Sequence, residues 1–447
     1  MFKNFHNYLI ISLLICLTGP LSFAQPKDNS PFSQFGIGDF FETDMPSSHA
    51  MGGLSAVYHD FFEANLENPA SLGFLQYTSL QLGLYAKYAR LDRVGDKESI
   101  WSGNLDHISV NLPLINPLND ALERRESDFA WGTSVSLRPY SQVGYFIRIN
   151  DLVDSIGQVE RTFTGSGGLY HANWGNGIKY KNFAAGINLG LIYGKQSFSE
   201  ETLFRDLELG YRNAFESTTS YKGFTYRVGL LYEHPFDLAE ARENDENPSR
   251  LLSAGIFFGG QSSLDTRTDN LQLAILRISN TTIDIDTASI QLDEAGEAIL
   301  PGTWGAGLMY RQAGKFRVGV DYQGARWSEY SNTARPHEMK DTYRLGFGAA
   351  WIPDADAIGS YFKRVEYRAG FYTLSDPRVI EGEQVKASAV TVGAQFPLIL
   401  QRNIAWFQVG LDVGSRNGGE NLKENFVRGK VGFIFNDSSW FIRGKYN

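Results

Sequence analysis

Three polar residues in the first half of the chain carry side chains that some enzymes use for catalysis: His107, Ser109 and His171. His107 and Ser109 are two positions apart on a predicted strand and so share a face, where an imidazole could activate a hydroxyl group. The chain has neither a Gly-x-Ser-x-Gly elbow nor a paired acid motif that would complete such a site. We therefore interpret these residues as ordinary strand residues and predict that the protein is not an enzyme.

Two further motifs could bind a cofactor or a metal ion. The stretch Gly346-Phe347-Gly348 begins like a dinucleotide-binding fingerprint, but it lies within a predicted strand that no helix follows, so the phosphate-binding geometry is missing. Asp284, Asp286, Asp293 and Glu294 could gather a calcium ion, but they lack the spacing of a loop that wraps one. We interpret these carboxylates as solvated loop charges and predict neither a cofactor nor a metal site.

Charged residues instead follow a regular alternation between residues 303 and 436. In the stretch 316–323 the even positions are apolar or aromatic, while the odd positions are charged, polar or glycine, and the same alternation recurs from residues 343, 365, 390, 407 and 427. A period of two indicates extended strands with one apolar and one polar face. The charged members of the polar rows are Asp321, Arg344, Glu366, Arg368, Asp412, Arg428 and Lys430. We predict that they line a wet lumen, pair across neighbouring strands and contact whatever fills that lumen, at under about 1 kcal/mol for each exposed pair.

Alternating strands fit either a membrane barrel or a soluble sandwich, whose strands hide one face against a second sheet. Runs of nine or more residues match the length that a tilted strand needs to cross a bilayer. The apolar rows often end in Tyr, Trp or Phe, as in interfacial girdles, and the polar rows suit a water-filled interior. Only a closed barrel presents a sheet to lipid without unpaired backbone edges. The sequence therefore predicts an all-β fold, a transmembrane antiparallel β-barrel.

The predicted barrel has about fourteen strands, an even number, as single-chain bacterial barrels require. The strands are expected at 79–91, 103–114, 128–153, 158–181, 182–203, 213–234, 251–265, 302–312, 315–330, 341–352, 364–374, 388–399, 404–416 and 426–436. If the first strand runs outward, the short connections 181–182, 313–314 and 397–403 are periplasmic and 266–301 is a long outer loop. Charged stretches at 119–126 and 237–243 are expected to form short surface helices.

Composition supports one membrane domain rather than several soluble ones. No Pro/Ser-rich linker divides the 447 residues, and no apolar run after residue 24 is long enough for a spanning helix. Lys3, the apolar stretch 9–17 and Ser22-Phe23-Ala24 resemble a secretory signal cleaved after Ala24. The single cysteine, Cys16, lies in that signal, so no disulfide is expected, and the net charge of −9 argues against a nucleic-acid partner.

Residues 25–78 lack the alternation but are rich in apolar side chains and turn residues. The features that we select are Phe32, Phe35, Gly36, Gly38, the Gly52-Gly53 pair and the Asn68-Pro69 step. Glycine and an Asn-Pro step favour tight turns, and the flanking aromatic residues need burial. We expect this segment to fill the barrel as a hatch, with these residues at the ligand or gating position.

Several of these motifs together resemble the FadL/TodX group of outer-membrane channels, in its Bacteroidetes branch. They are the Gly36/Gly38 segment, Met51-Gly52-Gly53, the stretch from Asn68 to Leu72, the stretch from Arg138 to Tyr145 and the stretch from Leu422 to Phe426. The resemblance implies a fourteen-stranded barrel closed by an N-terminal hatch, in the outer membrane of a Gram-negative bacterium. It also implies four parts: a signal peptide (1–24), a hatch (25–78), a barrel (79–437) and a periplasmic tail (438–447).

The resemblance implies a channel that passes hydrophobic, fatty-acid-like molecules by energy-independent diffusion gated by the hatch, with outer-membrane lipid and a hydrophobic small molecule as partners. Because a charged lumen is a poor solvent for such cargo, we expect it to leave sideways through the wall near the bend at Pro139. The alternative is a barrel of the same fold that does not transport and serves a secretion or surface-assembly machine as a protein partner. A transporter needs an apolar cavity between hatch and wall, whereas an accessory barrel can be packed solid.

Overall fold

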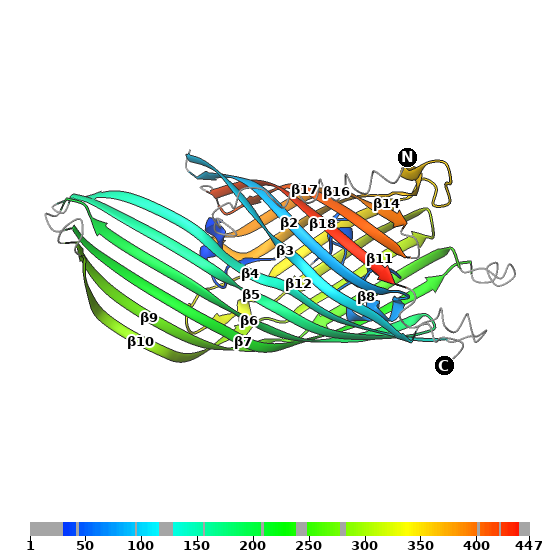
Figure 1. Ribbon diagram of the computed structural model, residues 1–447, viewed down its shortest axis with the longest axis horizontal. Helices are drawn as coiled ribbons and strands as arrows, with labels where there is room; N and C mark the ends of the chain where they lie inside the picture. The colour runs from blue at the N-terminus through cyan, green and yellow to red at the C-terminus, as the bar shows by residue number, and fades with distance from the viewer. Residues whose placement is uncertain are drawn as a thin grey trace.

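Fourteen wall strands, each paired antiparallel with its neighbours, close into a barrel (Figure 1). A computed structural model describes residues 30–41, 44–93, 96–115, 128–154, 157–206, 210–237, 248–277, 283–399, 403–419 and 422–437. The expected signal peptide, the tail after residue 437, the helix at 119–126 and all but the first residue of the helix at 237–243 lie outside these residues. Within them, no helix is long and apolar enough to cross a bilayer.

Sixteen strands build these fourteen wall strands and follow the chain in order around the barrel. They are β2 (Thr78–Arg93), β3 (Asp96–Ile115), β4 (Phe129–Val153), β5 (Gly157–Tyr180), β6 (Phe183–Phe204), β7 (Gly210–Pro235), β8 (Arg250–Gly259), β9 (Ser262–Arg277), β10 (Ile283–Leu300), β11 (Thr303–Gln312), β12 (Phe316–Ala325), β14 (Thr342–Trp351), β15 (Glu366–Ile380), β16 (Glu383–Ile399), β17 (Ile404–Asn417) and β18 (Leu422–Asp437). β8 and β9 both pair with β7 and together form one wall strand. On their other side β11 pairs with β8 and β10 pairs with β9, so β10 and β11 together form the next wall strand. β18 pairs with β2 and closes the circle, which confirms the predicted fourteen-stranded barrel.

The alternation in the sequence becomes the two faces of this wall. On β12, for example, Val318 is 50% exposed on the outer face, whereas Asp321 is 2% exposed on the inner face. Trp351 and Tyr367 contact each other on the outside of β14 and β15, as expected for an aromatic girdle. The outer face is therefore apolar where the barrel would meet lipid.

One expected connection is wrong. Residues 266–301, expected as a long outer loop, are mostly strand, because β9 and β10 pair as a hairpin from Ser262↔Leu300 to Arg277↔Ile283. Both faces of this hairpin carry polar residues, so the one-sided apolar pattern of a membrane strand is missing. Its Thr, Ile and Leu residues nevertheless favour extended backbone.

The wall is not fully paired along its whole height. β3 pairs with β4 only from Ile108↔Leu137 to Ile115↔Trp131. Beyond Leu137, two residues before Pro139, β4 pairs with β5 on one side; on the other side only a short strand, β1 (Asp39–Phe40), is added at Ser141 and Gln142. Side chains bridge part of this gap, since Asn104 Nδ2 donates to Gln142 Oε1 at 3.2 Å.

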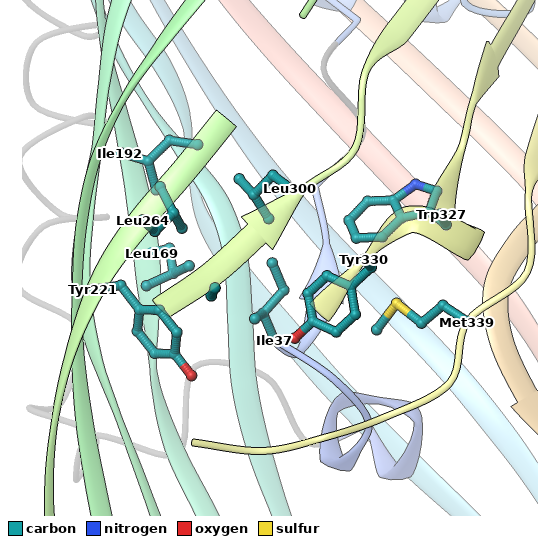
Figure 2. Packing of buried hydrophobic residues seen from close by; sticks show 10 residues of the cluster. Ile37, Leu169, Ile192, Tyr221, Leu264, Leu300, Trp327, Tyr330 and Met339 are labelled. Carbon is teal, nitrogen blue, oxygen red and sulfur yellow. The ribbon is translucent and has the colours of Figure 1, made fainter. Parts of the chain in front are cut away.

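The described residues of the stretch 30–77, called the luminal segment below, lie against the inner face of the wall. Besides β1, the segment contains the 3₁₀ turns η1 (Pro31–Gln34) and η2 (Pro69–Phe74) and the helical turn α2 (Pro46–His49). Ile37 is fully buried in a cluster with Leu169, Ile192 and Leu264 from the wall and with Trp327, Tyr330 and Met339 from the connection between β12 and β14 (Figure 2). The segment and the wall thus share one core.

Candidate functional site in the barrel lumen

Asp44, just before α2, is the centre of a buried charge cluster between the luminal segment and the wall. Lys430 Nζ on β18 donates to Asp44 Oδ1 at 3.1 Å, and Arg344 Nη2 on β14 donates to Asp44 Oδ2 at 3.2 Å. Asp44 is 3% exposed and the Lys430 side chain 2%. Burial alone would raise the pKa of Asp44, but Lys430, His49 and Arg344 outweigh it and hold this pKa well below its usual range.

His49, the last residue of α2, joins this cluster to a second wall carboxylate. Its Nδ1 lies 3.0 Å from Asp44 Oδ2 and its Nε2 lies 3.0 Å from Asp412 Oδ1 on β17. Arg428 on β18 donates to the other oxygen of Asp412 at 2.7 Å. Burial alone would lower the pKa of His49, but the carboxylates of Asp44 and Asp412 outweigh it and raise this pKa. The chain of contacts therefore favours a positively charged His49.

Asp321 on β12 holds the backbone of the luminal segment rather than a side chain. One carboxylate oxygen accepts the N–H groups of Ser55 and Ala56, each at 2.6 Å, and neighbouring Gln323 donates to the Ser55 hydroxyl at 2.6 Å. A buried backbone N–H group needs an acceptor, and the inward carboxylate of this wall strand satisfies both amides.

Asp39, the first residue of β1, binds two wall arginines. Arg378 Nη2 and Arg416 Nη1 donate to its Oδ1 at 2.7 and 2.8 Å. Arg416 also donates to Glu424 Oε2 at 2.8 Å, and Arg378 pairs with Asp376. Phe32 is fully buried beside this cluster, with its ring 4.1 Å from the Arg416 guanidinium carbon. Each arginine therefore pairs with one carboxylate of the segment and one carboxylate of the wall.

Three more acidic residues of the luminal segment are buried against the wall. Glu67 pairs with Arg138 of β4 and Arg227 of β7, and Asp60 pairs with Arg317 of β12 at 3.2 Å. Glu63 instead accepts neutral donors, including Gln408 Nε2 of β17 at 2.9 Å. Ion pairs and hydrogen bonds thus fasten the segment along most of its length.

All seven charged residues predicted to line the lumen do face inward. Arg317 Nε lies 3.0 Å from Glu366, and Arg368 Nη2 donates to Glu366 at 3.1 Å. The expectation of wet, weakly interacting pairs is wrong here, since the Arg368 and Glu366 side chains are 1% and 8% exposed. The luminal segment excludes the water that the sequence pattern alone suggested.

The selected glycines lie where the segment turns or touches the wall. Gly36, Gly38, Gly52 and Gly53 all have positive φ, between 59° and 95°. A Cβ at Gly52 would lie 2.4 Å from the Phe347 carbonyl oxygen, and its N–H donates to Thr391 Oγ1 at 3.0 Å. Only glycine fits both the backbone conformation and this approach.

The remaining selected residues shape the ends of the segment. Asn68 Oδ1 accepts from Ala70 N at 3.1 Å, capping η2, whose first residue is Pro69, and Asn68 Nδ2 donates to the Ala56 carbonyl at 2.5 Å. Phe35 contacts the His337 ring with centroids 5.4 Å apart. None of these residues forms a binding pocket by itself, and their role in gating or ligand binding stays a prediction.

A cavity of about 300 Å³ remains between β1 and the wall. Phe40, Phe41, Tyr140, Phe257, Trp304 and Phe426 provide aromatic surface, but nine lining residues are charged: Asp39, Glu67, Lys87, Arg227, Arg344, Asp376, Arg416, Glu424 and Arg428. The cavity is therefore mixed in character rather than apolar.

The residues considered for catalysis are not brought together. His107 Nδ1 lies 2.7 Å from Asp106 Oδ2, Ser109 donates to Gln81 at 3.0 Å, and His171 Nε2 lies 2.8 Å from the Thr225 hydroxyl. Within the described part of the chain, no group of His, Cys, Asp and Glu could hold a metal ion.

The acidic residues of the luminal segment that pair with the wall were not predicted from the sequence, although the sequence contains a signal for them. Residues 30–77 contain six Asp or Glu and no Lys or Arg. A segment with only negative charges, expected inside a lumen with many arginines, indicates charge pairing between the two.

Comparison with known proteins assigns the family. The sequence matches the BamG family over residues 1–447. The chain belongs to the BamG family. No curated protein matches the sequence.

Solved structures with the same fold are outer-membrane hydrocarbon channels. The toluene transporters TbuX of Ralstonia pickettii and TodX of Pseudomonas putida each have a TM-score of 0.53 and 14% identity, and the match covers 90% of this chain and 99% of theirs. The CymD monoaromatic hydrocarbon channel matches at a TM-score of 0.51, with the same identity and coverage. At this identity the likeness establishes the fold alone, so the FadL/TodX resemblance holds for the barrel, and the family of the sequence is BamG.

Proposed function

We propose that this BamG-family barrel works with its lumen closed, as an accessory subunit of an outer-membrane assembly or secretion machine. The observation that carries the proposal is the fastening of the luminal segment: Asp39, Asp44, Asp60 and Glu67 each pair with buried or half-buried basic residues of the wall. A hatch held at four places along its length acts as a permanent plug.

The cavity supports the same conclusion. A fatty-acid-like cargo needs apolar surroundings, since a buried charge gains nothing from a hydrocarbon neighbour and loses water. The cavity of about 300 Å³ instead presents charged side chains on several sides, among them Arg227, Arg344 and Arg428. The BamG family also favours a role within protein machinery over passage of a small molecule.

A hydrophobic-compound channel is the second candidate, and one observation favours it. The unpaired stretch between β3 and β4 lies beside the cavity, and Phe41, which lines the cavity, packs on Tyr85 of β2 with ring centroids 5.2 Å apart. A small aromatic molecule could leave the lumen sideways at this place if Phe41 moved. The solved channels with the same fold carry monoaromatic hydrocarbons, so this alternative predicts a cargo of that class.

An engineered disulfide that locks the luminal segment separates the two functions. A Cβ at Gly410 would lie 3.7 Å from the Ala50 Cβ, within the range of about 3.5 to 4.5 Å that a disulfide requires. The only natural cysteine is Cys16, in the expected signal peptide, so the pair Ala50→Cys and Gly410→Cys can form one defined bond. The two single variants are the controls, because the new Cβ at Gly410 is crowded by Pro46.

Cells that lack the gene and produce each variant provide the measurement. We expect deletion to lower the amounts of other outer-membrane proteins without slowing toluene or fatty-acid uptake, and we expect the oxidised double variant to restore those amounts fully. Loss of uptake on deletion, recovered with the locked variant only after reduction, would instead establish a gated channel and refute the accessory role.

A further inference from the structure

Six of the wall strands continue well past the rest of the wall, at the left end of the view in Figure 1. We call their outer parts the projecting sheet: residues 141–153 of β4, 157–169 of β5, 194–204 of β6, 210–223 of β7, β9 and β10. Its outermost strands, β4 and β10, each have one long edge without a partner strand among the described residues. A sheet edge with free backbone groups can accept another strand.

The open edge of β4 presents a regular row of backbone groups. Ser30 N–H donates to the Gly144 carbonyl at 2.9 Å, and Gly144 N–H donates to Ser33 Oγ at 3.1 Å, so the backbone of Gly144 points away from β5. In a strand this direction repeats every second residue. The N–H and C=O groups of Phe146, Arg148, Asn150 and Leu152 therefore point to the same open side.

This edge carries two charged residues, Arg148 and Asp151, but lacks other features that protect exposed strands from pairing. From Ser141 to Val153 the ladder with β5 has no bulge, and the stretch contains neither proline nor lysine. Phe146 and Leu152 are 49% and 79% exposed, and Ile147 and Ile149 on the other face are half-buried. A long and regular edge with exposed apolar side chains is a liability for an isolated protein, which favours a bound strand as its partner.

The opposite edge of the same sheet is protected. β10 has register shifts between Thr287 and Ser289 and between Gln291 and Glu294, and Asp293 has a φ of 56°. It also carries the acids Asp286, Glu294 and Glu297. Bulges and edge charges of this kind prevent strand addition. Of the two edges, only that of β4 is built to accept a partner.

The chain itself already uses the first part of the β4 edge for strand addition. β1 pairs antiparallel with it at Gln142 and Ser141, and η1 continues the contact to Gly144. The open stretch 146–152 extends this interface directly outward. An added strand would therefore continue an interface that the structure contains.

We propose that an extended segment of a different protein adds to this edge as an antiparallel strand along residues 146–152. The identity of that partner as a subunit of the same machine rests on the proposed function. To fit, the segment needs apolar residues opposite Ile147 and Ile149 and an acidic residue near Arg148, which is paired with Glu160 but has a side chain 52% exposed.

A second copy of the chain does not fit this edge. All copies have the same orientation in one membrane, so the β4 of a second copy would run parallel to the first. The outer strand that runs the other way is β10, and its bulges and carboxylates block pairing. The partner is therefore a different protein.

Amide hydrogen exchange tests the proposal without knowledge of the partner. The protein is compared in isolated outer membranes and after purification in detergent, with fragments covering 144–154. We expect the amides of Phe146, Arg148, Asn150 and Leu152 to exchange about tenfold more slowly, or slower still, in membranes, because a paired edge N–H is protected. The edge of β10 is the internal control and should exchange equally in both samples.

A proline variant checks that protection comes from strand pairing. Arg148→Pro removes an N–H that points to the open edge and spares the ladder to β5, so protection of Phe146 and Asn150 should be lost in membranes. The matched control is Ala295→Pro on β10. The backbone N–H and C=O groups of Glu297 form hydrogen bonds with Thr333 on the open side of β10. The backbone N–H of Ala295, two residues earlier in the same strand, therefore points to that side too. This control should leave the protection at β4 unchanged.

Three outcomes would overturn the proposal. Fast exchange in both samples means that nothing covers the edge, and slow exchange in both means that the chain covers it itself. Protection that appears only when two differently tagged copies co-purify means a second copy. Protection together with unchanged amounts of other outer-membrane proteins after gene deletion would support strand pairing while refuting the accessory role, so the two ideas fail separately.

Discussion

Neutralising Asp44 should loosen the luminal segment without unfolding the wall. In Asp44→Asn, Lys430 keeps Asp106 at 2.9 Å and His49 keeps Asp412, but both lose a buried anion. Removing one member of a buried ion pair costs about 3 to 5 kcal/mol. Because Lys430 keeps another partner and the Arg344 side chain is 14% exposed, we expect the lower end, about 3 kcal/mol.

Proteolysis measures this opening directly. The segment has no Lys or Arg, so trypsin cannot cut it, but chymotrypsin can cut at Phe32, Phe35, Tyr58 and Phe74 once they leave the lumen. If opening is fast compared with cleavage, the rate follows the open population, and 3 kcal/mol corresponds to about a hundredfold faster cleavage.

The control for this variant is an exposed pair of the same kind. Arg267 and Asp293 on the projecting sheet are 3.1 Å apart, with side chains 58% and 75% exposed. Such pairs contribute about 0.2 to 1 kcal/mol, so Asp293→Asn should change cleavage of the segment by less than about fivefold. Equal rates for Asp44→Asn and Asp293→Asn would refute the argument that buried charges fasten the segment.

Three further predictions concern pH, the lipid face and topology. The pKa of His49 is raised above its ordinary 6.5, so the stabilisation of the closed luminal segment by charged His49 is complete below pH 6.5 and is lost as pH rises through the raised pKa. Chymotrypsin cleavage should therefore accelerate over this pH range, and much less so in His49→Gln. Val392→Arg, at an outer position of β16 that is 47% exposed, should cost about 2 to 4 kcal/mol and reduce insertion, whereas Phe215→Arg on the projecting sheet should insert normally, as judged by heat-modifiable gel migration. A protease site inserted between Arg277 and Ile283 should be cut in whole cells, and one between Ile399 and Ile404 should be spared; the reverse pattern would invert the barrel.

The wall could be predicted from sequence because each membrane strand faces lipid on one side. That asymmetry imposes a period of two, and on β12 and β14 the structure follows the pattern residue by residue. In the β9–β10 hairpin the buried face of β9 carries Thr266 and Thr268 beside Leu264, so polar residues occupy both faces and the sequence pattern predicts a loop. The luminal ion pairs were beyond sequence reasoning for another reason. Asp39 and Arg378 are 339 residues apart, and their contact depends on the register of many intervening strands.

The alternation along a strand predicts whether a side chain points into or out of the barrel, but not which residues pack against it. Gln408 belongs to a polar row, and from the alternation alone an arginine at this position would simply face the lumen. It is 2% exposed and donates to Glu63, so an arginine there would have to displace the luminal segment. The alternation predicts that Gln408 points inward, whereas its burial depends on the luminal segment, which packs against it.

The apolar side chains of the luminal segment determine how strongly it is held, and the ion pairs determine where. Phe32, Ile37, Met51, Leu54 and Leu72 are between 0% and 2% exposed. At about 1.5 to 3 kcal/mol for each side chain, returning these five to water would cost roughly 8 to 15 kcal/mol. Buried ion pairs add less net stability than this, but they penalise any wrong placement of a charge.

This cost limits how far a small molecule could shift the luminal segment out of its closed position. A ligand shifts an equilibrium only by the difference between its affinities for the two states. Even if a hydrophobic compound bound only the open state, with a Kd of about 1 μM, it would contribute about 8 kcal/mol at most. That value does not exceed the apolar burial of five residues, and the rest of the segment adds to the cost. A compound of that affinity would therefore not displace the luminal segment, in agreement with the proposed accessory role.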